Sequence, residues 1–277
     1  MKDPLYIDRG GHRTWLKWHR GRRRASDPVF TGARIVEGMR LGASVEVDLT
    51  TCRGGGFAIL HDPALGSETT GSGRIADKTA AELRREFMRD NSGRPTTEPV
   101  RLLEDLAGLL SGDAIHPDAL LQLDYKEDAA ALGGNALANF AASVAPFAAN
   151  AILSSGDAEA VRLLTGAAPA IRVGYDPCHG DALKRLATSR DFSGFVATAV
   201  ADSPRAEMIY LAYPVVLEAA DAGFDIVAAF HDAGRRIDAY TIRAADKASE
   251  PLVAALLERK VDQITTDDPE GIAALFG

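Results

Sequence analysis

Short apolar segments alternate with amphipathic segments along most of the chain. The short segments are aliphatic or β-branched and end at glycine, proline or polar residues, which predicts buried strands. We expect strands over Thr14–Trp18, Ser44–Leu49, Phe57–Leu60, Leu120–Tyr125, Ala151–Ser154, Ala170–Tyr175, Gly194–Thr198, Ile237–Ile242 and Gln263–Thr266. Between most of them apolar residues recur every three or four positions, which predicts helices over Gly32–Leu41, Val100–Leu110, Ala129–Ala145, Asp157–Leu164, Asp181–Leu186, Glu218–Ala233 and Glu250–Glu258.

The alternation of strand and helix favours a parallel sheet in a protein of the α/β class. When Phe57–Leu60 is treated as an excursion, about eight strands remain, and that number suits a closed (β/α)8 barrel. A chain of 277 residues fits one such domain, so we expect a single domain over residues 1–277. The segment from about 62 to 100 breaks the alternation with many glycines and prolines around one short helix near Thr79–Arg89. We expect it to be a small cap-like insertion after the second strand.

The composition limits the partners of the protein. Hydrophobic residues make up 46% of the chain and charged residues 25%, and 39 acidic residues outnumber 31 Lys and Arg. The net charge of −8 argues against binding to nucleic acid or to an anionic membrane, both of which need broad positive surfaces. The longest apolar stretch, residues 136–153, contains Asn139 and Pro146 and predicts a packed helix, not a membrane span. We expect a small-molecule partner; the sequence carries no signal for an oligomeric state.

Cysteine use and the first residues bear on the compartment. Cys52 and Cys178 are far apart in the sequence and form no CxxC pair, so neither a disulfide framework nor a cysteine zinc site is expected. Met1–Lys17 has no apolar core followed by a cleavage site. We therefore expect a protein of the reducing cytoplasm.

Charged side chains occur within or directly after two of the predicted strands. Glu46 and Asp48 are two positions apart in one strand, so the pleat directs both to the same face. Asp124 and Lys126 have the same spacing at the end of another strand. A buried carboxylate without a partner is costly, so positive charge must lie among these groups. Three carboxylates converging at the mouth of a barrel suit Mg²⁺ or Ca²⁺, which prefer oxygen ligands; ion pairs with nearby arginines are the alternative.

Two histidines stand at strand ends, His19 after Trp18 and His61 after Leu60. Imidazole exchanges a proton near neutral pH, so two of them on either side of a scissile bond can act as base and acid. The alternative for each histidine alone is a structural role. Arg20 follows His19 directly, and its planar guanidinium is suited to a phosphate oxygen.

The order of these motifs resembles the glycerophosphodiester phosphodiesterase family. The matching stretches are His19-Arg-Gly21, Gly42-Ala-Ser-Val-Glu-Val-Asp48, His61-Asp-Pro-Ala-Leu65, Thr69-Thr-Gly-Ser-Gly73, Leu123-Asp-Tyr-Lys126 and Ile264-Thr-Thr-Asp-Asp-Pro269. The similarity runs from about Leu16 to the C-terminus, and it rests on order and spacing together.

The resemblance implies a TIM barrel with a small insertion and the metal-dependent hydrolysis of a phosphodiester. It assigns a divalent cation, Mg²⁺ or Ca²⁺ with Mn²⁺ as a third candidate, to three carboxylates: Glu46, Asp48 and Asp124. It assigns acid–base catalysis to His19 and His61, with His19 favoured as the first base, and phosphate binding to Arg20 and Lys126. In that family the reaction commonly begins with attack of a neighbouring substrate hydroxyl on phosphorus, which leaves a cyclic phosphate for water to open.

The chain departs from the family pattern at the barrel mouth. Pro28–Thr31 lacks the usual Glu and Asn, Asp124 replaces a glutamate, Tyr240 replaces a tryptophan, and Arg22–Arg24 adds positive charge. We therefore expect an alcohol other than simple glycerol, such as the sugar phosphodiesters hydrolysed by agrocinopine-type enzymes. Tyr240 and Arg172 are further candidates for substrate contact, although Arg172 has the alternative of a strand-end arginine paired with an acid.

Two other functions remain open from the sequence. A phospholipase D-like lyase would use the same site but stop at the cyclic phosphate. A barrel that binds a phosphorylated metabolite without turnover is the second alternative, and the missing Glu and Asn give it weight. Retention of both histidines, Glu46, Asp48 and Lys126 favours the hydrolase.

Overall fold

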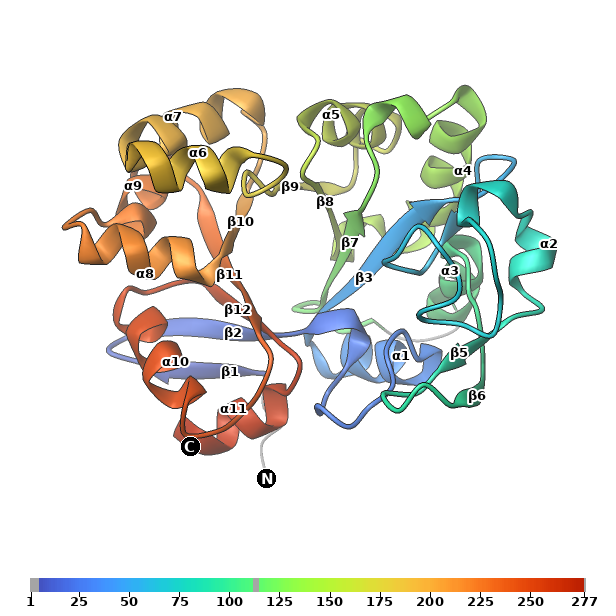
Figure 1. The fold of residues 1–277 in the computed structure, drawn as a ribbon, viewed down its shortest axis with the longest axis horizontal. Coiled ribbons are helices and arrows are strands. Elements are labelled where there is room, and N and C mark those ends of the chain that lie inside the picture. The colour runs from blue at the N-terminus through green and yellow to red at the C-terminus, as the bar shows by residue number, and fades with distance from the viewer. Residues whose placement is uncertain (1–4, 112–114, 277) are drawn as a thin grey trace.

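Eight parallel strands form a closed barrel in the computed structural model, which describes residues 5–111 and 115–276 (Figure 1). In ring order they are β2 (His12–Trp18), β3 (Ser44–Thr51), β7 (Leu120–Tyr125), β8 (Ala151–Ser155), β9 (Arg172–Tyr175), β10 (Met208–Ala212), β11 (Arg236–Ile242) and β12 (Gln263–Thr266). Pairing of β12 with β2, from Gln263 opposite Trp15 to Thr266 opposite Trp18, closes the ring. The predicted (β/α)8 barrel is confirmed.

Helices surround the strands on the outside of the barrel (Figure 1). They are α1 (Gly32–Leu41), α3 (Leu103–Ser111), α4 (Gly134–Val144), α5 (Ala158–Ala167), α6 (Ala182–Ser189), α7 (Phe192–Asp202), α8 (Tyr213–Asp221), α9 (Ile226–Asp232), α10 (Ser249–Glu258) and α11 (Pro269–Phe276), with short 3₁₀ turns at Ala129–Ala131 and Ala145–Asn150. Their apolar faces are buried against the strands, as with Ala160, Val161 and Leu164 of α5. Among the described residues, every helix is too short or too polar to span a membrane.

Two predicted elements differ from the structure. Gly194–Thr198, expected as a strand, lies inside α7, because the Asp191 side chain accepts a hydrogen bond from the Gly194 N–H and starts a helix there. The missing barrel strand is β10, a fully apolar run that follows α7. The helix expected over Glu218–Ala233 is divided into α8 and α9 at Gly223, whose φ of +79° suits glycine and ends the first helix.

The chain leaves the barrel after β3 and returns at α3. This excursion contains β4 (Phe57–Ala58), which pairs antiparallel with the end of β3, a 3₁₀ turn (Ile75–Asp77), α2 (Ala80–Leu83) and the hairpin of β5 (Phe87–Arg89) and β6 (Pro95–Pro99). It lies beside β3 (Figure 1). Its Ile75, Leu83 and Met88 side chains are buried in the same hydrophobic core as Val45, Val47 and Leu49 of β3. The excursion thereby holds residue 61 close to the end of β3. One further strand, β1 (Tyr6–Arg9), lies outside the closed ring and pairs antiparallel with β2.

Alternate residues of each barrel strand face the apolar core beneath the helices and the interior of the barrel. Residues such as Val45, Val47 and Leu49 of β3 belong to the apolar core, while Glu46 and Asp48 alternate with them. Inside the barrel, a buried ion pair joins Lys17 Nζ to Asp238 Oδ2 at 3.1 Å, and Asp238 also accepts hydrogen bonds from Gln263 and Thr265. At this level the barrel interior is therefore polar, and Lys17 and Asp238 neutralise each other below the charged groups of the C-terminal mouth.

Candidate active site

A cavity of about 370 Å³ lies at the C-terminal ends of the barrel strands. Its walls combine acidic, basic, imidazole and phenol groups: His19, Arg20, Glu46, His61, Asp124, Lys126, Asp176, Tyr210, Tyr213, Tyr240, Arg243 and others. Most of the residues singled out from the sequence therefore face one space. This end of a (β/α)8 barrel is where active sites are found.

Three carboxylates from two neighbouring strands come together. Glu46 and Asp48 on β3 and Asp124 on β7 each offer an oxygen within 4.8 Å of the others, and Asp48 lies opposite Asp124 in the strand register. Asp48 is fully buried, and within the described structure neither of its carboxylate oxygens accepts a hydrogen bond. Its oxygens lie 2.8 Å from Lys126 Nζ and 3.1 Å from Arg20 Nε. This oxygen donor set fits a hard divalent cation.

The charges around these carboxylates shift their pKa values in different directions. Burial raises the pKa of Asp48 above its ordinary value, and the nearby Glu46 charge adds to this effect. Burial also acts on Glu46, but the charges of His19 and Lys126 outweigh it and lower its pKa. Burial also acts to raise the pKa of Asp124, but the charge and hydrogen bond of Lys126, with the hydrogen bond from Ser154, outweigh it and lower that pKa. Burial itself disfavours the ionised form of all three carboxylates, so a cation bound among them would stabilise their charge.

His19 is fixed between two acids. It lies in the 3₁₀ turn His19–Gly21 directly after β2, and its Nδ1 is 2.5 Å from Oδ1 of Asp267, which follows β12. Its Nε2 lies 3.9 Å from Oε2 of Glu46. Burial acts to raise the pKa of Asp267, but its bond to His19 and the Arg22 charge lower it. Sequence reasoning did not assign Asp267 a role, although the Thr-Asp-x-Pro stretch that contains it was the available signal.

His61 is held by the excursion after β4. Its Nδ1 lies 2.8 Å from Asp62 Oδ1, and the backbone N–H groups of His61 and Asp62 both donate to Glu68 Oε2 at 3.0 Å. The other Glu68 oxygen lies 3.4 Å from a guanidinium nitrogen of Arg20. Glu68 thus connects the His61 loop to the His19 turn. No sequence motif singled it out.

The arginine run after His19 is tied to acids. Arg22 bonds Asp267, Arg23 bonds Glu37 and Glu270, and Arg24 bonds Glu270. These contacts favour a structural role for Arg23 and Arg24 over contact with a substrate. Arg20 differs, because its side chain lines the cavity and its backbone N–H donates to Glu46 Oε2 at 2.7 Å.

Tyr240 and Arg172, the two remaining candidates for substrate contact, lie at different cavities. The Tyr240 hydroxyl lines the cavity and donates to Asp176 Oδ2 at 2.8 Å. Burial, with the charge of Asp124, raises the pKa of Asp176 to about 6. Arg172 is not at this site: it begins β9, its Nε lies 3.0 Å from Glu207 Oε2, and it lines a different cavity with Trp15 and Ser44. The expectation that Arg172 contacts substrate is wrong because a charge at the first residue of a strand faces the opposite end of the barrel.

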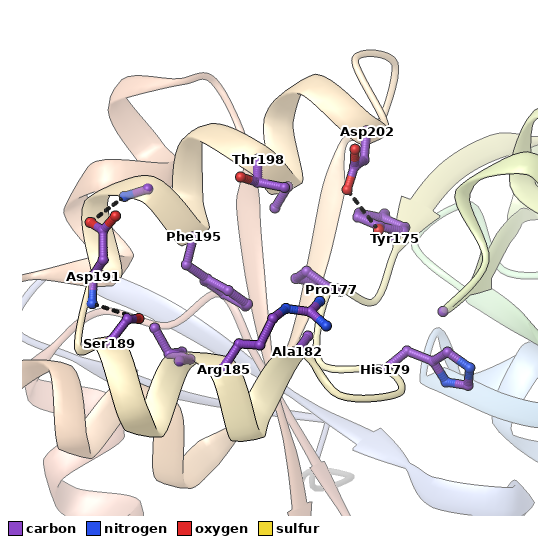
Figure 2. Close-up of a pocket in the computed structure, with 14 residues that line it drawn as sticks. Tyr175, Pro177, His179, Ala182, Arg185, Ser189, Asp191, Phe195, Thr198 and Asp202 are labelled. Atoms are coloured by element: carbon purple, nitrogen blue, oxygen red, sulfur yellow. Dashed lines mark hydrogen bonds between the residues drawn. The ribbon is translucent and has the colours of Figure 1, made fainter.

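A second cavity, of about 330 Å³, lies between α6 and α7 (Figure 2). Arg185 reaches from α6 towards Pro177, and Phe195 points from α7 into the same gap (Figure 2). The Tyr175 hydroxyl donates to Asp202 at one edge of the cavity. None of the three carboxylates and neither His19 nor His61 lines this space, so the chemistry belongs to the first cavity.

Sequence comparison agrees with this geometry. The sequence pattern of the glycerophosphoryl diester phosphodiesterase family matches residues 35–271, most of the chain. The chain belongs to this family. As a glycerophosphoryl diester phosphodiesterase family member it is an enzyme of the phosphoric diester hydrolase class. No curated protein sequence matches the chain significantly.

Solved structures of glycerophosphodiester phosphodiesterases share the fold of this family member. The enzyme from Thermotoga maritima is 20% identical, with a TM-score of 0.67 over 95% of this chain and 99% of that one. The enzyme from Agrobacterium tumefaciens is 20% identical, with a TM-score of 0.66 over 94% and 99%. A phosphodiesterase from Oleispira antarctica, in complex with the product sn-glycerol-3-phosphate, is 20% identical with a TM-score of 0.63 over 94% and 95%.

Proposed function

We propose that the enzyme hydrolyses a small glycerophosphodiester or sugar phosphodiester to an alcohol and a phosphomonoester in a metal-dependent reaction. The observation that carries the proposal is the convergence of Glu46 and Asp124 with two imidazoles around one cavity, where buried Asp48 lies within 4.8 Å of both carboxylates. Family membership supports the phosphodiester, and the sn-glycerol-3-phosphate bound to the Oleispira antarctica relative supports a small phosphate ester.

Glu46, Asp48 and Asp124 would hold the cation. The set consists of oxygens only, which suits Mg²⁺ or Ca²⁺ and also accommodates Mn²⁺. The unbonded oxygens of Asp48, buried between a lysine and an arginine, are available as ligands. When bound, the cation would offset the negative charge that develops on the phosphoryl oxygens.

His19 is the proposed first base. With Nδ1 held by Asp267, its Nε2 faces the cavity and can take the proton from the substrate hydroxyl next to the phosphate. The hydroxyl oxygen then bonds to phosphorus as the bond from phosphorus to the leaving alcohol breaks. Because the attacking hydroxyl belongs to the same molecule, much of the entropic cost of bringing the reactants together is avoided.

His61 is the proposed acid, which gives a proton to the leaving alcohol oxygen. Its Nδ1 is directed to Asp62, whose pKa is lowered by hydrogen bonds from Ser67 and His61, so the carboxylate can support a protonated imidazole. In the second step His61 takes a proton from water, the water oxygen bonds to phosphorus, the ring P–O bond breaks, and His19 returns its proton to the released hydroxyl. Arg20 and Lys126 are the proposed phosphate contacts.

The alcohol is proposed to be a sugar or another group larger than glycerol. Tyr240 of β11 and Asp176, which follows β9, line the cavity together, and Tyr240 replaces the tryptophan usual in the family. We propose that the excursion, which supplies His61 and Glu68, caps the β3 side of the mouth. The cytoplasm remains the proposed compartment, and Cys52 and Cys178 are both buried and unbridged.

Product analysis tests the proposal. Purified enzyme is given glycerophosphocholine and, separately, a sugar phosphodiester with Mg²⁺ or Ca²⁺, and phosphorus NMR follows the products. We expect phosphomonoester from both and faster turnover of the sugar ester. An accumulating cyclic phosphate would make the enzyme a lyase, and binding without turnover would make it a metabolite-binding barrel.

A further inference from the structure

The wall of the active-site cavity opposite the carboxylates carries donors that the protein does not use. Arg243 directly follows β11 and Tyr213 directly follows β10, and both side chains line the cavity. Across the described residues, no hydrogen bond or ion pair reaches the Arg243 guanidinium, and none reaches the Tyr213 hydroxyl. Arg243 does help to lower the pKa of Asp267 through its charge, but it forms no ion pair with that residue.

Other cations that line the cavity are all paired. Lys17 is joined to Asp238, Arg20 to Asp48 and Glu68, and Lys126 to Asp48 and Asp124. Arg243 is exposed at the rim, where its guanidinium fork can meet a carboxylate or phosphate bidentately. Among the described Lys and Arg side chains that line the cavity, Arg243 is therefore the one without an acidic partner.

The ring order places these donors across the barrel from the catalytic groups. β10 and β11 lie opposite β3 and β7, which carry the three carboxylates. A substrate whose phosphorus lies at the carboxylates and His19 would extend its alcohol towards Tyr213 and Arg243. An anionic group on that alcohol would lie across the barrel from Glu46, Asp48 and Asp124 and beside the guanidinium of Arg243, whose charge would offset that of Asp176 on the same wall.

We propose that Arg243, assisted by Tyr213, selects phosphodiesters whose alcohol carries a second anionic group, a carboxylate or a phosphate. This inference rests on the proposed phosphodiesterase function. Arg243 is a specificity-determining residue in this account, because it contacts the distal end of the substrate and not the reacting atoms.

A matched pair of substrates tests the inference: glycerophosphoglycerol, and the same ester with a phosphate on its distal hydroxyl. The readout is the ratio of kcat/KM for the phosphorylated ester to that for the neutral ester. We expect the wild-type ratio to favour the phosphorylated ester and to fall with added salt. Arg243→Ala should lower the ratio about tenfold through KM, and Arg243→Lys should restore part of it.

Arg185→Ala is the matched control, because Arg185 is another exposed arginine whose guanidinium has no partner in the described structure, and it lines the separate cavity of Figure 2. Its ratio should equal that of the wild type. An unchanged ratio in Arg243→Ala, with both esters turned over, would overturn the inference and leave the proposed function intact. If neither ester is turned over, the proposed function fails. The role of Arg243 is then tested by calorimetry, as the ratio of the affinity for the phosphorylated ester to that for the neutral ester, which Arg243→Ala should lower.

Discussion

The two imidazoles of the site are held in different ways. His19 is anchored by Asp267 in a mostly buried position, whereas the His61 side chain is 39% exposed and depends on the loop around Glu68. The buried anchor fixes which nitrogen of His19 faces the cavity. We therefore expect His19 to be the residue whose loss reduces the chemical step most.

Replacement of His19 by alanine should lower kcat about 10²–10⁴-fold, the usual contribution of a positioned general base, with little change in melting temperature. Steady-state kinetics on glycerophosphocholine and thermal melting measure the two effects. His179→Ala is the control, since His179 is exposed and its imidazole forms no hydrogen bond with any described residue. Wild-type turnover in the His19 variant would remove its assignment as base.

Asp176 gives the protein a pH-dependent stability. Its pKa in the folded protein is about 6, raised by burial and by Asp124 from an ordinary value of 3.8, so the unfolded chain releases this proton at lower pH. The group therefore costs stability above about pH 6, the cost shrinks as pH falls towards 4, and it is absent below that.

Asp176→Asn should raise the melting temperature of chelator-treated protein by about 3 °C at pH 7 and by much less at pH 4. Thermal unfolding at the two pH values measures this difference. Equal changes at both pH values would show that Asp176 titrates normally in the fold.

The site residues that the sequence revealed are those whose spacing has a structural meaning. The pleat argument placed Glu46 and Asp48 on one face, and β3–β7 pairing brings Asp124 opposite Asp48. Asp267 and Glu68 were missed because their roles depend on contacts between segments far apart in the chain. Arg172 was misplaced because a charge in an apolar run does not reveal which mouth of the barrel it faces.

At the scale of elements, α1 packs against the barrel through a glycine. A Cβ on Gly38 would lie 2.6 Å from Cγ2 of Val45 and 3.2 Å from the Trp18 ring, both of them buried in the core. Gly108 in α3 has open space at the same point. The two helices thus offer one glycine required by packing and one that is not.

Gly38→Ala should therefore destabilise the fold by about 1–3 kcal/mol through overpacking, whereas Gly108→Ala should stabilise it by about 0.5–1 kcal/mol through helix propensity. Urea unfolding of both variants checks this pair. If both changes stabilise the protein, the contact between α1 and β3 is looser than described.

Glu68 connects the excursion to the barrel, since it accepts from two N–H groups of the His61 loop and pairs with Arg20. Glu68→Ala should lower kcat about 10–100-fold by releasing His61 from its position, because small misplacements of a catalytic group are costly. Glu68→Gln retains an acceptor and should recover much of the rate. If the two variants are equally slow, the negative charge of Glu68 matters more than its hydrogen bonds.

Most elements could be predicted because short apolar runs mark the buried strands and apolar residues recur every three or four positions in the helices. The prediction failed at Gly194–Thr198, where a run of small apolar residues carries little periodicity and the Asp191 cap decided for a helix. It also missed Met208–Ala212, a strand in which all but the last residue are buried, and which therefore shows no alternation. The count of about eight strands was nevertheless correct, because one false strand replaced one missed strand.

At the scale of the whole molecule, the closed barrel brings negatively charged side chains together at its C-terminal mouth. The chain carries a net charge of −8, yet the mouth of the barrel collects three carboxylates from two strands within 4.8 Å of one another. Lys126 and Arg20 offset part of this charge. We propose that a divalent cation offsets the rest and that turnover depends on it.

Phosphodiester turnover before and after chelation tests that claim most directly, with Mg²⁺, Ca²⁺ and Mn²⁺ added back singly. Chelation should lower kcat/KM at least about 100-fold, and one of the ions should restore it. Asp48→Asn should not be restored, whereas the exposed Asp232→Asn control should behave as wild type. Full activity in the chelated wild-type enzyme would contradict the account.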